Sequence, residues 1–511
     1  MSSISETART GQLTQAPTTE AAPRAPLAAL WSPATIRARC AAITRAVDSG
    51  SSGWFRLDRS RLPDLARRVA ELTRQRYPEL RVPLHSRWRH FEAGGVNRAA
   101  ELDAALAGRD ALDAARARID LTVISVLLDA GAGPDWRYDE SKAARLDPLA
   151  LPAHRQRRDE LLAMLDRASG QGAAPAAAPT AGPDISPGPE GDKPEVPAAA
   201  ASVQIVQPPL AASAPPPAST QIWGRSEGLA IATFRAFMAG SFSQADKDPL
   251  RVDARVLTRL DAAALRAIFQ GGPSNPLTGL DGRAELLRRL GTVLEQRSGN
   301  DGRLPRPSML FDAWLSRGGT VHAGDILSLL VSEWAPIWLH GSRVLGLPAG
   351  DVWPHAWAGS DTGPEPGQNP DRPTGGWVPF HKLTQWLVYS LVEPLQSAGL
   401  QVTGLESLTG LPEYRNGGLL LDGGVIVPRD PRDLARSWKV SDEWVVEWRA
   451  LTVQLLDELA ALVRAQLGLD AQQLPLAAVL EGGTWAAGRE LAQSLRGGAP
   501  PVRIDSDGTV F

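Results

Sequence analysis

Cysteine is almost absent from this chain of 511 residues. Cys40 is its only cysteine. A single cysteine excludes an internal disulfide framework and a cysteine-rich zinc site, and it suits a reducing compartment. Cys40 lies within the helical pattern IRARCAAITRAV, so we interpret it as a buried, unreactive thiol.

Long apolar runs and a strong excess of one charge are also missing. Nowhere do about eighteen apolar residues follow one another, which excludes a membrane-spanning segment. The polar, Ala/Pro-rich start does not have the pattern of a secretory signal. The net charge of −3 gives no electrostatic footprint for nucleic acid or an anionic membrane. We therefore expect a cytoplasmic protein without nucleic-acid or membrane partners.

Several motifs that carry chemistry do not occur. The sequence contains no HExxH, no paired His–carboxylate metal spacing and no Gly-x-Ser-x-Gly elbow. His322 and His381 each stand alone near an expected helix start, where a structural role is usual. The sequence therefore predicts no metal, no cofactor and no acyl-transfer triad.

Composition divides the chain into four parts. Residues 1–27 form a Ser/Thr/Ala/Pro-rich tail that we expect to be disordered. Residues 28–169 follow a helical pattern, and residues 170–220 form an Ala/Pro-rich insert that reads as an extended linker. The helical pattern resumes over residues 221–511. We expect both helical parts to form one fold around the insert.

Apolar periodicity favours a mainly α fold with a few short strands. Ser32 and Pro33 are typical of a helix start, and Ser441 precedes a long amphipathic segment. Strand patterns are few: LQVTGL, a hairpin LLLDGGVIV that turns at Asp422–Gly423, and the terminal VRIDSDGTVF.

The loop LTGLPEYRNGG contains Glu413, Tyr414 and Arg415 in succession. Pro412 restricts the residue before it to extended conformations, and the glycine pair that follows permits close approach to a ligand. A carboxylate, a phenol and a guanidinium on so constrained a loop predict a preorganised polar site. From spacing alone, a salt-bridged turn before a strand is the favoured interpretation of the loop.

A second candidate is VPLHSRWRHFEAGG. If residues 84–91 are extended, His85, Arg87 and Arg89 share one face, and Ser86, Trp88 and His90 share the other. Two guanidiniums and an imidazole on one face suit a phosphate or a carboxylate. A solvated, charged strand is the alternative.

A third candidate is LLDAGAGPDWRYDE, with Asp129 at a helix end and then Trp136 and Tyr138. The C-terminus of a helix is electrostatically unfavourable for a carboxylate. Asp129 is therefore strained, paired or functional, and the sequence leaves the choice open.

Seven segments together resemble one known family. They are HSRWRHFEAGG, LLDAGAGPDWRY, SEGLA, NPLTGLDGR, HAGD, VPFHKLTQWL and LTGLPEYRNGGLLLD. This is the uracil-catabolism (URC pathway) family of fungi and bacteria, long described as a domain of unknown function. The resemblance spans about residues 30–511 apart from the insert. It implies a role in a pyrimidine-degradation route that passes through a ribosylated urea.

A fainter resemblance concerns the chemical step. LTGLPEYR followed by VSDEWVVEWRALTVQLLDELA is similar to the C-terminal part of the queuosine-nucleoside glycosylases. Those proteins carry an Asp-Tyr-Arg run and then a Glu-x-Glu-x-Arg helix. Glu413 stands where they have Asp, and Glu447 and Arg449 match the helix loosely. The resemblance implies a glycosylase-like helical architecture.

Together these patterns predict an enzyme that hydrolyses the N-glycosidic bond of ribosylurea or its 5′-phosphate. Glu413 is the expected catalytic carboxylate and Asp129 the second, with His85 or His90 as the acid. The expected substrate-binding residues are Arg87, Arg89, Trp88, Trp136, Tyr138, Tyr414 and Arg415. The expected partner is a nucleoside-like or phosphoribosyl small molecule, and other enzymes of the route are further possible partners. The alternatives are an amidohydrolase that acts on the opened uracil ring and a non-catalytic scaffold subunit.

Overall fold

The computed structural model describes residues 22–143, 221–245, 248–297, 304–359 and 374–505. The Ala/Pro-rich insert 170–220 and residues 1–21 of the predicted tail lie outside these ranges. Residues 22–27 of that tail begin a 3-10 helix, η1 (Ala22–Trp31). Within the described ranges, no helix is both long and apolar enough to cross a membrane.

The chain is mainly helical with short strands, which confirms the predicted fold class. The longer helices are α1 (Pro33–Asp48), α2 (Leu62–Arg76), α5 (Ala111–Leu127), α8 (Arg225–Met238), α11 (Leu280–Arg297), α13 (Ala323–Trp334), α14 (Lys382–Ser397), α16 (Glu443–Leu467) and α18 (Trp485–Arg496). The shorter ones are α3 (Arg87–Phe91), α4 (Arg98–Leu106), α6 (Glu140–Ala143), α9 (Ala254–Leu257), α10 (Ala262–Ile268), α12 (Asp312–Arg317), α15 (Tyr414–Asp422) and α17 (Leu476–Val479). The 3-10 helices η2 (Arg59–Arg61), η3 (Ala93–Gly95), η5 (Pro307–Phe311), η6 (Ala335–Ile337), η7 (Leu405–Ser407) and η8 (Pro431–Ala435) connect them.

The described strands pair two by two. The pairs are β1 (Phe55–Leu57) with β10 (Ile426–Pro428), β2 (Tyr138–Asp139) with β3 (Ile222–Trp223), β4 (Gly319–His322) with β9 (Leu400–Thr403), β5 (Ser342–Val344) with β6 (Leu347–Gly350), β7 (Val352–Pro354) with β8 (Trp377–Pro379) and β11 (Ser437–Lys439) with β12 (Arg503–Asp505). The pairs β4–β9 and β11–β12 are parallel and the others antiparallel. These ladders join distant segments and build no extended sheet.

Local signals explain where the long helices begin. Ser32 caps α1 by accepting a hydrogen bond from the backbone N–H of Ala34, with Pro33 as the first helical residue, as predicted. The long C-terminal helix begins at Glu443 and is capped by Asp442, one residue after the expected Ser441.

Two predicted extended segments are wrong. Arg87–Phe91 forms the short helix α3, and the backbone N–H of Arg87 donates to Ser390 in α14. Tertiary contacts therefore override the alternating pattern. The first arm of the predicted hairpin is α15, and its second arm, β10, pairs with β1 instead. Glu413 caps α15, so the loop precedes a helix rather than a strand.

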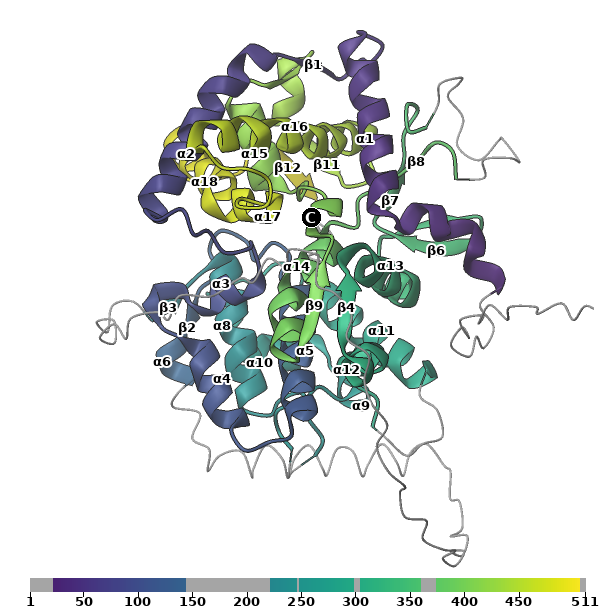
Figure 1. Ribbon diagram of the computed structural model, residues 1–511, viewed down its shortest axis with the longest axis vertical. Coiled ribbons are helices and arrows are strands. Elements are labelled where there is room, and N and C mark those ends of the chain that lie inside the picture. Colours follow the sequence, from purple (N-terminus) through teal and green to yellow (C-terminus); the bar gives the residue numbers. More distant parts are fainter. Residues whose placement is uncertain (1–21, 144–220, 246–247, 298–303, 360–373, 506–511) are drawn as a thin grey trace, which may run out of the picture.

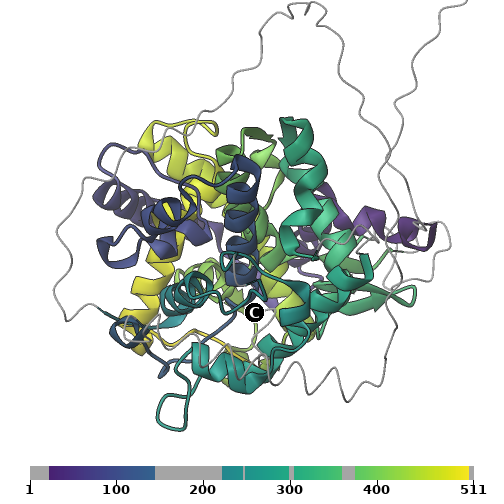
Figure 2. The same cartoon turned by 90° about the horizontal axis from the view of Figure 1, so that it is seen from below.

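Two large hydrophobic clusters form the core. One gathers mainly residues 84–411 with parts of α1 and α16, and the other gathers α2, the opposite face of α16, α15 and the C-terminal segments. Figure 1 shows the second group of helices (α2, α15–α18) in the upper half and α3, α5 and α8 in the lower half. In Figure 2, α5 and α8 lie side by side, as their packing contacts require. Both clusters draw residues from both sides of the insert.

Candidate active site

Charged and aromatic side chains from six segments meet at the boundary between the two halves. The segments are α3 with the two residues before it, the residues just after α5, the first turns of α8, α14 and α15, and the segment from residue 480 to α18. We call the following set the polar cluster: His85, His90, Asp129, Arg225, Glu227, Lys382, Trp386, Glu413, Tyr414, Arg415, Glu481, Trp485 and Arg489.

Two histidines lie between two indole rings. The ring centroids of His85 and His90 are 6.2 Å apart. Trp386 lies 6.2 Å from His85 and 5.7 Å from His90, and Trp485 lies 5.9 and 6.1 Å from them. The two indoles therefore form aromatic walls beside the histidines, whereas the sequence analysis expected Trp88 and Trp136 to contact the substrate.

Glu481 holds His85 in place. Its Oε2 lies 2.8 Å from Nδ1 of His85, and its Oε1 accepts hydrogen bonds from Arg76 and Tyr77. Burial raises the pKa of Glu481, but the hydrogen bond from His85 and the nearby charge of Arg76 outweigh it and lower the pKa to about 2. The carboxylate is therefore ionised at neutral pH. It fixes the imidazole by Nδ1 and leaves Nε2 to act on a ligand.

A π-helical turn, η9 (Leu480–Thr484), presents Glu481. Such turns are rare and frequently occur at functional sites. The turn packs closely on α2, since a Cβ at Gly483 would lie 2.5 Å from the carbonyl oxygen of Val69.

His90 is a buried, neutral imidazole. Burial and the charge of Arg87 lower its pKa to about 4, against the opposite influence of Glu227 and Asp129. Its Nδ1 has no hydrogen-bond partner among the described residues. At neutral pH the uncharged ring can donate one hydrogen bond and accept another.

Asp129 follows α5, and its side chain is 8% exposed. Oδ1 lies 3.4 Å from the Arg87 guanidinium but has no hydrogen-bond partner among the described residues. Arg87 is fully buried and donates to Ser125 Oγ, Ser125 O and Ser226 O. Arg87 therefore offers Asp129 an ion pair, while its own N–H groups donate to Ser125 and Ser226 inside the protein.

The loop before α15 is a helix cap. Both oxygens of Glu413 accept backbone N–H groups, from Arg415 at 2.8 Å and Asn416 at 2.6 Å. Burial raises the pKa of Tyr414, and the charges of Glu413 and Asp129 act in the same direction. The Arg415 guanidinium lies 4.3 Å from the Trp485 ring and 5.0 Å from the Tyr414 ring, and its Nε and Nη2 have no hydrogen-bond partner within the described ranges.

Lys382 brings an ammonium group to the cluster. It is 8% exposed at the first position of α14, and burial lowers its pKa, partly offset by Glu413, Asp351 and Asp129. Asp351 fixes this helix start, because it accepts the Lys382 backbone N–H and forms a two-bond ion pair with Arg449.

Five of the predicted binding residues lie outside the cluster, and Arg87, described above, is one of them. Trp88 and Trp136 are buried and donate to the carbonyls of Ser390 and Phe269, and Tyr138 is buried in the same core. Arg89 is paired with Glu92 and Glu393.

Glu447, which matches the second glycosylase motif, is buried elsewhere. It accepts a hydrogen bond from Ser52 and lies 3.3 Å from His355.

The cluster contains several buried polar atoms that lack a hydrogen-bond partner among the described residues. They are His90 Nδ1, Asp129 Oδ1, Trp386 Nε1, and Nε and Nη2 of Arg415. Buried polar groups in proteins are nearly always paired, so each such atom requires an explanation. A polar ligand that bonds to them explains the whole set. No group of three His, Cys, Asp or Glu side chains suited to a metal ion occurs in the described part of the chain.

Comparison with known proteins places the chain in a family. A family model described as "Protein of unknown function (DUF1688)" matches residues 29–163 and 213–511. The chain belongs to this family. The DUF1688 match omits residues 164–212, which overlap the Ala/Pro-rich insert.

Two curated proteins are similar along most of their length. "Protein urg3" of Schizosaccharomyces pombe is 32% identical over 95% of this chain and 99% of its own. "Uracil catabolism protein 4" of Lachancea kluyveri is 31% identical over 91% of this chain and 93% of its own. The predicted resemblance to the uracil-catabolism family is thereby confirmed.

Proposed function

We propose that this protein acts in uracil catabolism by hydrolysing the N-glycosidic bond of ribosylurea or its 5′-phosphate, with release of urea. The name of the Lachancea relative supports the route. The observation that carries the chemical step is the set of unpaired buried polar atoms beside two indole walls. A ribosylated urea offers both donors and acceptors to these atoms. Its flat urea group fits between aromatic rings.

The carboxylate that acts at the anomeric carbon is Asp129. Cleavage of an N-glycosidic bond builds oxocarbenium character at this carbon, which a buried carboxylate stabilises. The sequence analysis gave this role to Glu413, but both oxygens of Glu413 are engaged by the cap of α15. Asp129 has an oxygen without a hydrogen-bond partner in the described structure. Glu413 becomes the second carboxylate, and its charge acts on Lys382 and Tyr414.

In the reaction the bond from the anomeric carbon to the urea nitrogen breaks, and a bond to a water oxygen forms. Asp129 accepts the proton of this water, and the departing urea nitrogen receives a proton from His85 through Nε2. Glu481 keeps the imidazole oriented during the transfer. Tyr414 and neutral His90 bind the hydroxyl and amide groups, while the indole walls exclude water and strengthen these interactions.

Urea release from purified full-length protein tests the proposal. The protein is incubated with ribosylurea and, separately, with its 5′-phosphate, and both urea and ammonia are measured. We expect urea release, with a loss of roughly 10²-fold or more in Asp129→Asn, the scale of one acid–base group, and a smaller loss in Glu413→Gln, which does not transfer a proton.

Glu79→Gln is the matched control, because Glu79 is an exposed carboxylate that pairs with Arg81 and does not belong to the polar cluster. Its activity should equal that of the unmodified protein. Ammonia without urea would instead favour the amidohydrolase alternative, and neither product from either substrate would overturn the proposed reaction.

A further inference from the structure

Three arginines from three different helices gather on one side of the polar cluster. Arg225 is the first residue of α8, Arg415 lies in the first turn of α15, and Arg489 lies in α18. Arg415 and Arg489 lie over the same indole, with Cζ 4.3 and 5.8 Å from the Trp485 ring.

The charges of this group are not balanced. Glu227 pairs with Arg489 at 2.9 Å and is the one carboxylate among the groups that act on Arg225. Burial and the like charges of Arg415 and Arg489 lower the pKa of Arg225. Three guanidiniums with one carboxylate carry two surplus positive charges. A phosphate monoester carries close to two negative charges near neutral pH.

Arg415 has donors to offer. It is 4% exposed, and its Nε and Nη2 lack a hydrogen-bond partner in the described structure. Stacking on the indole fixes the plane of the guanidinium and leaves its edge for two-pronged recognition of an oxyanion.

Arg225 adopts a backbone conformation that a large side chain rarely adopts, with φ of +53°. Such strain persists where the surrounding structure enforces it, and it gathers at functional sites. Arg225 Nη2 donates to the carbonyl of Gly498 at 3.3 Å, which anchors the side chain beside the cluster. α8 and α15 have 14 and 9 residues, and both begin here, so the positive ends of their dipoles add to the same field.

The arginines that the sequence analysis assigned to a phosphate are otherwise engaged. Arg87 donates to Ser125 and Ser226, and Arg89 is paired with two carboxylates. A phosphate that enters the cluster therefore meets the other three arginines.

We propose that Arg225, Arg415 and Arg489 form a phosphate-monoester subsite, so that the protein takes the 5′-phosphorylated form of its ribosyl substrate. The choice of substrate rests on the proposed function, whereas the anion subsite stands on its own geometry.

Calorimetric titration of the full-length protein with ribose 5-phosphate and with ribose tests the subsite without catalysis. Ribose 5-phosphate should bind at least about 10-fold more tightly than ribose. Arg489→Gln and Arg415→Lys should each weaken its binding about 10- to 100-fold and leave ribose binding unchanged, since a charge-assisted hydrogen bond is lost. Arg225→Lys should show a smaller loss, because Nη2 of Arg225 already donates to the carbonyl of Gly498 and is less available to a phosphate.

Arg68→Gln is the matched control, because Arg68 is an exposed arginine that pairs with Glu490. Its affinities should not change. Equal binding of ribose and ribose 5-phosphate would overturn the subsite, as would a phosphate preference that survives in Arg489→Gln and Arg415→Lys.

Urea release separates the two proposals. If the phosphate preference exists and depends on these arginines but no urea forms, the subsite stands and the proposed reaction fails. If urea forms equally fast from both substrates in wild type and Arg489→Gln, the reaction stands and the subsite fails.

Discussion

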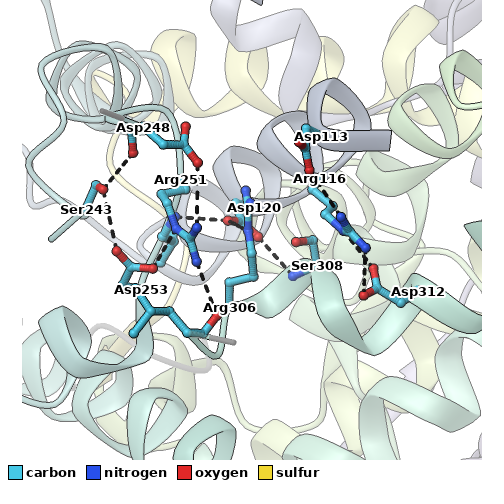
Figure 3. Close-up of polar contacts among 12 residues, drawn as sticks. Asp113, Arg116, Asp120, Ser243, Asp248, Arg251, Asp253, Arg306, Ser308 and Asp312 are labelled. Atoms are coloured by element: carbon cyan, nitrogen blue, oxygen red, sulfur yellow. Dashed lines mark hydrogen bonds and ion pairs between the residues drawn. The ribbon is translucent and has the colours of Figure 1, made fainter. Parts of the chain in front are cut away.

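Asp120 and Asp129 lie nine positions apart, within and just after α5, and their surroundings differ sharply. Asp120 is fully buried and accepts hydrogen bonds from the backbone N–H groups of Val252 and Ser308 and from Arg306 Nε, all at 2.8–2.9 Å (Figure 3). Asp129 has one arginine at 3.4 Å and an oxygen without a hydrogen-bond partner in the described ranges.

The neighbours of Asp120 continue this contrast. Asp253 accepts bonds from Arg251 and the backbone of Gln244, and Arg116 binds both oxygens of Asp312 (Figure 3). Two atoms of this network, Arg306 Nη2 and Ser308 Oγ, have no partner in the described structure, but its carboxylates are satisfied. Asp120 receives all its hydrogen bonds from the protein and therefore stabilises the fold. Asp129 has an oxygen without such a bond in the described ranges and is therefore able to bind a ligand.

The largest effect should come from Asp129→Asn. We expect about a 10³-fold loss of urea release, because the anion that stabilises the reacting carbon is replaced by a neutral amide. Steady-state kinetics check this, with the melting temperature as the test of folding. Wild-type activity in a folded Asp129→Asn protein would break the comparison.

Asp120→Asn should act on stability instead. Removal of this charge leaves Arg306 without its buried anion, so we expect a loss of about 3 kcal/mol in the free energy of unfolding. Denaturant unfolding measures the loss. The folded fraction should retain its specific activity. A large fall in that activity would contradict a purely structural role for Asp120.

Glu481→Gln tests whether the hydrogen bond between Glu481 and His85 contributes to catalysis. We expect a loss of roughly 10- to 100-fold in kcat, because the neutral amide no longer fixes the imidazole or stabilises its charged form. The pH–rate profile should shift as well. An unchanged profile with a lower melting temperature would indicate that Glu481 has only a structural role.

The smallest effect concerns His90 and pH. Its pKa is about 4 in the folded protein and about 6.5 when unfolded, so between these values the unfolded chain binds more protons. Stability should therefore fall as pH falls through this window, by roughly 1–2 kcal/mol from pH 7 to pH 5. The fall should be smaller in His90→Gln, measured by denaturant unfolding at both pH values.

His381 is also buried with a lowered pKa, so its protonation also favours the unfolded chain as pH falls. The difference between wild type and His90→Gln isolates the contribution of His90. Equal pH dependence in the two proteins would contradict the burial of a neutral imidazole at this position.

Local signals in the sequence sufficed for much of the fold. Ser32 and Pro33 mark the start of α1 because a helix cap depends on nearby residues. LQVTGL contains β9, whose pattern is local although its partner strand β4 is distant in the chain. The alternating pattern at residues 84–91 predicted an extended segment, and this prediction was wrong. α3 is held by contacts with α14 and α5, which lie too far away in the chain for a local pattern to reveal them.

The site was only partly accessible to sequence reasoning. Glu413 to Arg415, Asp129 and the two histidines stood in motifs, and the structure brings them into one cluster. Glu481 stands alone in a glycine-flanked segment, and Lys382 looks like an ordinary first-turn residue. Their importance comes from burial and from neighbours far away in the chain, which spacing does not encode.

The π-helical turn at residues 480–484 makes the site sensitive to the number of residues in the chain. It holds one residue more than an α-helical turn, and each α-helical residue advances the helix by about 100°. Loss of Gly482 or Gly483 would change neither charge nor hydrophobicity. It would nevertheless rotate Trp485 and Arg489 by about a quarter turn relative to Glu481. The Trp485 indole and the Arg489 guanidinium would then no longer face His85 and His90.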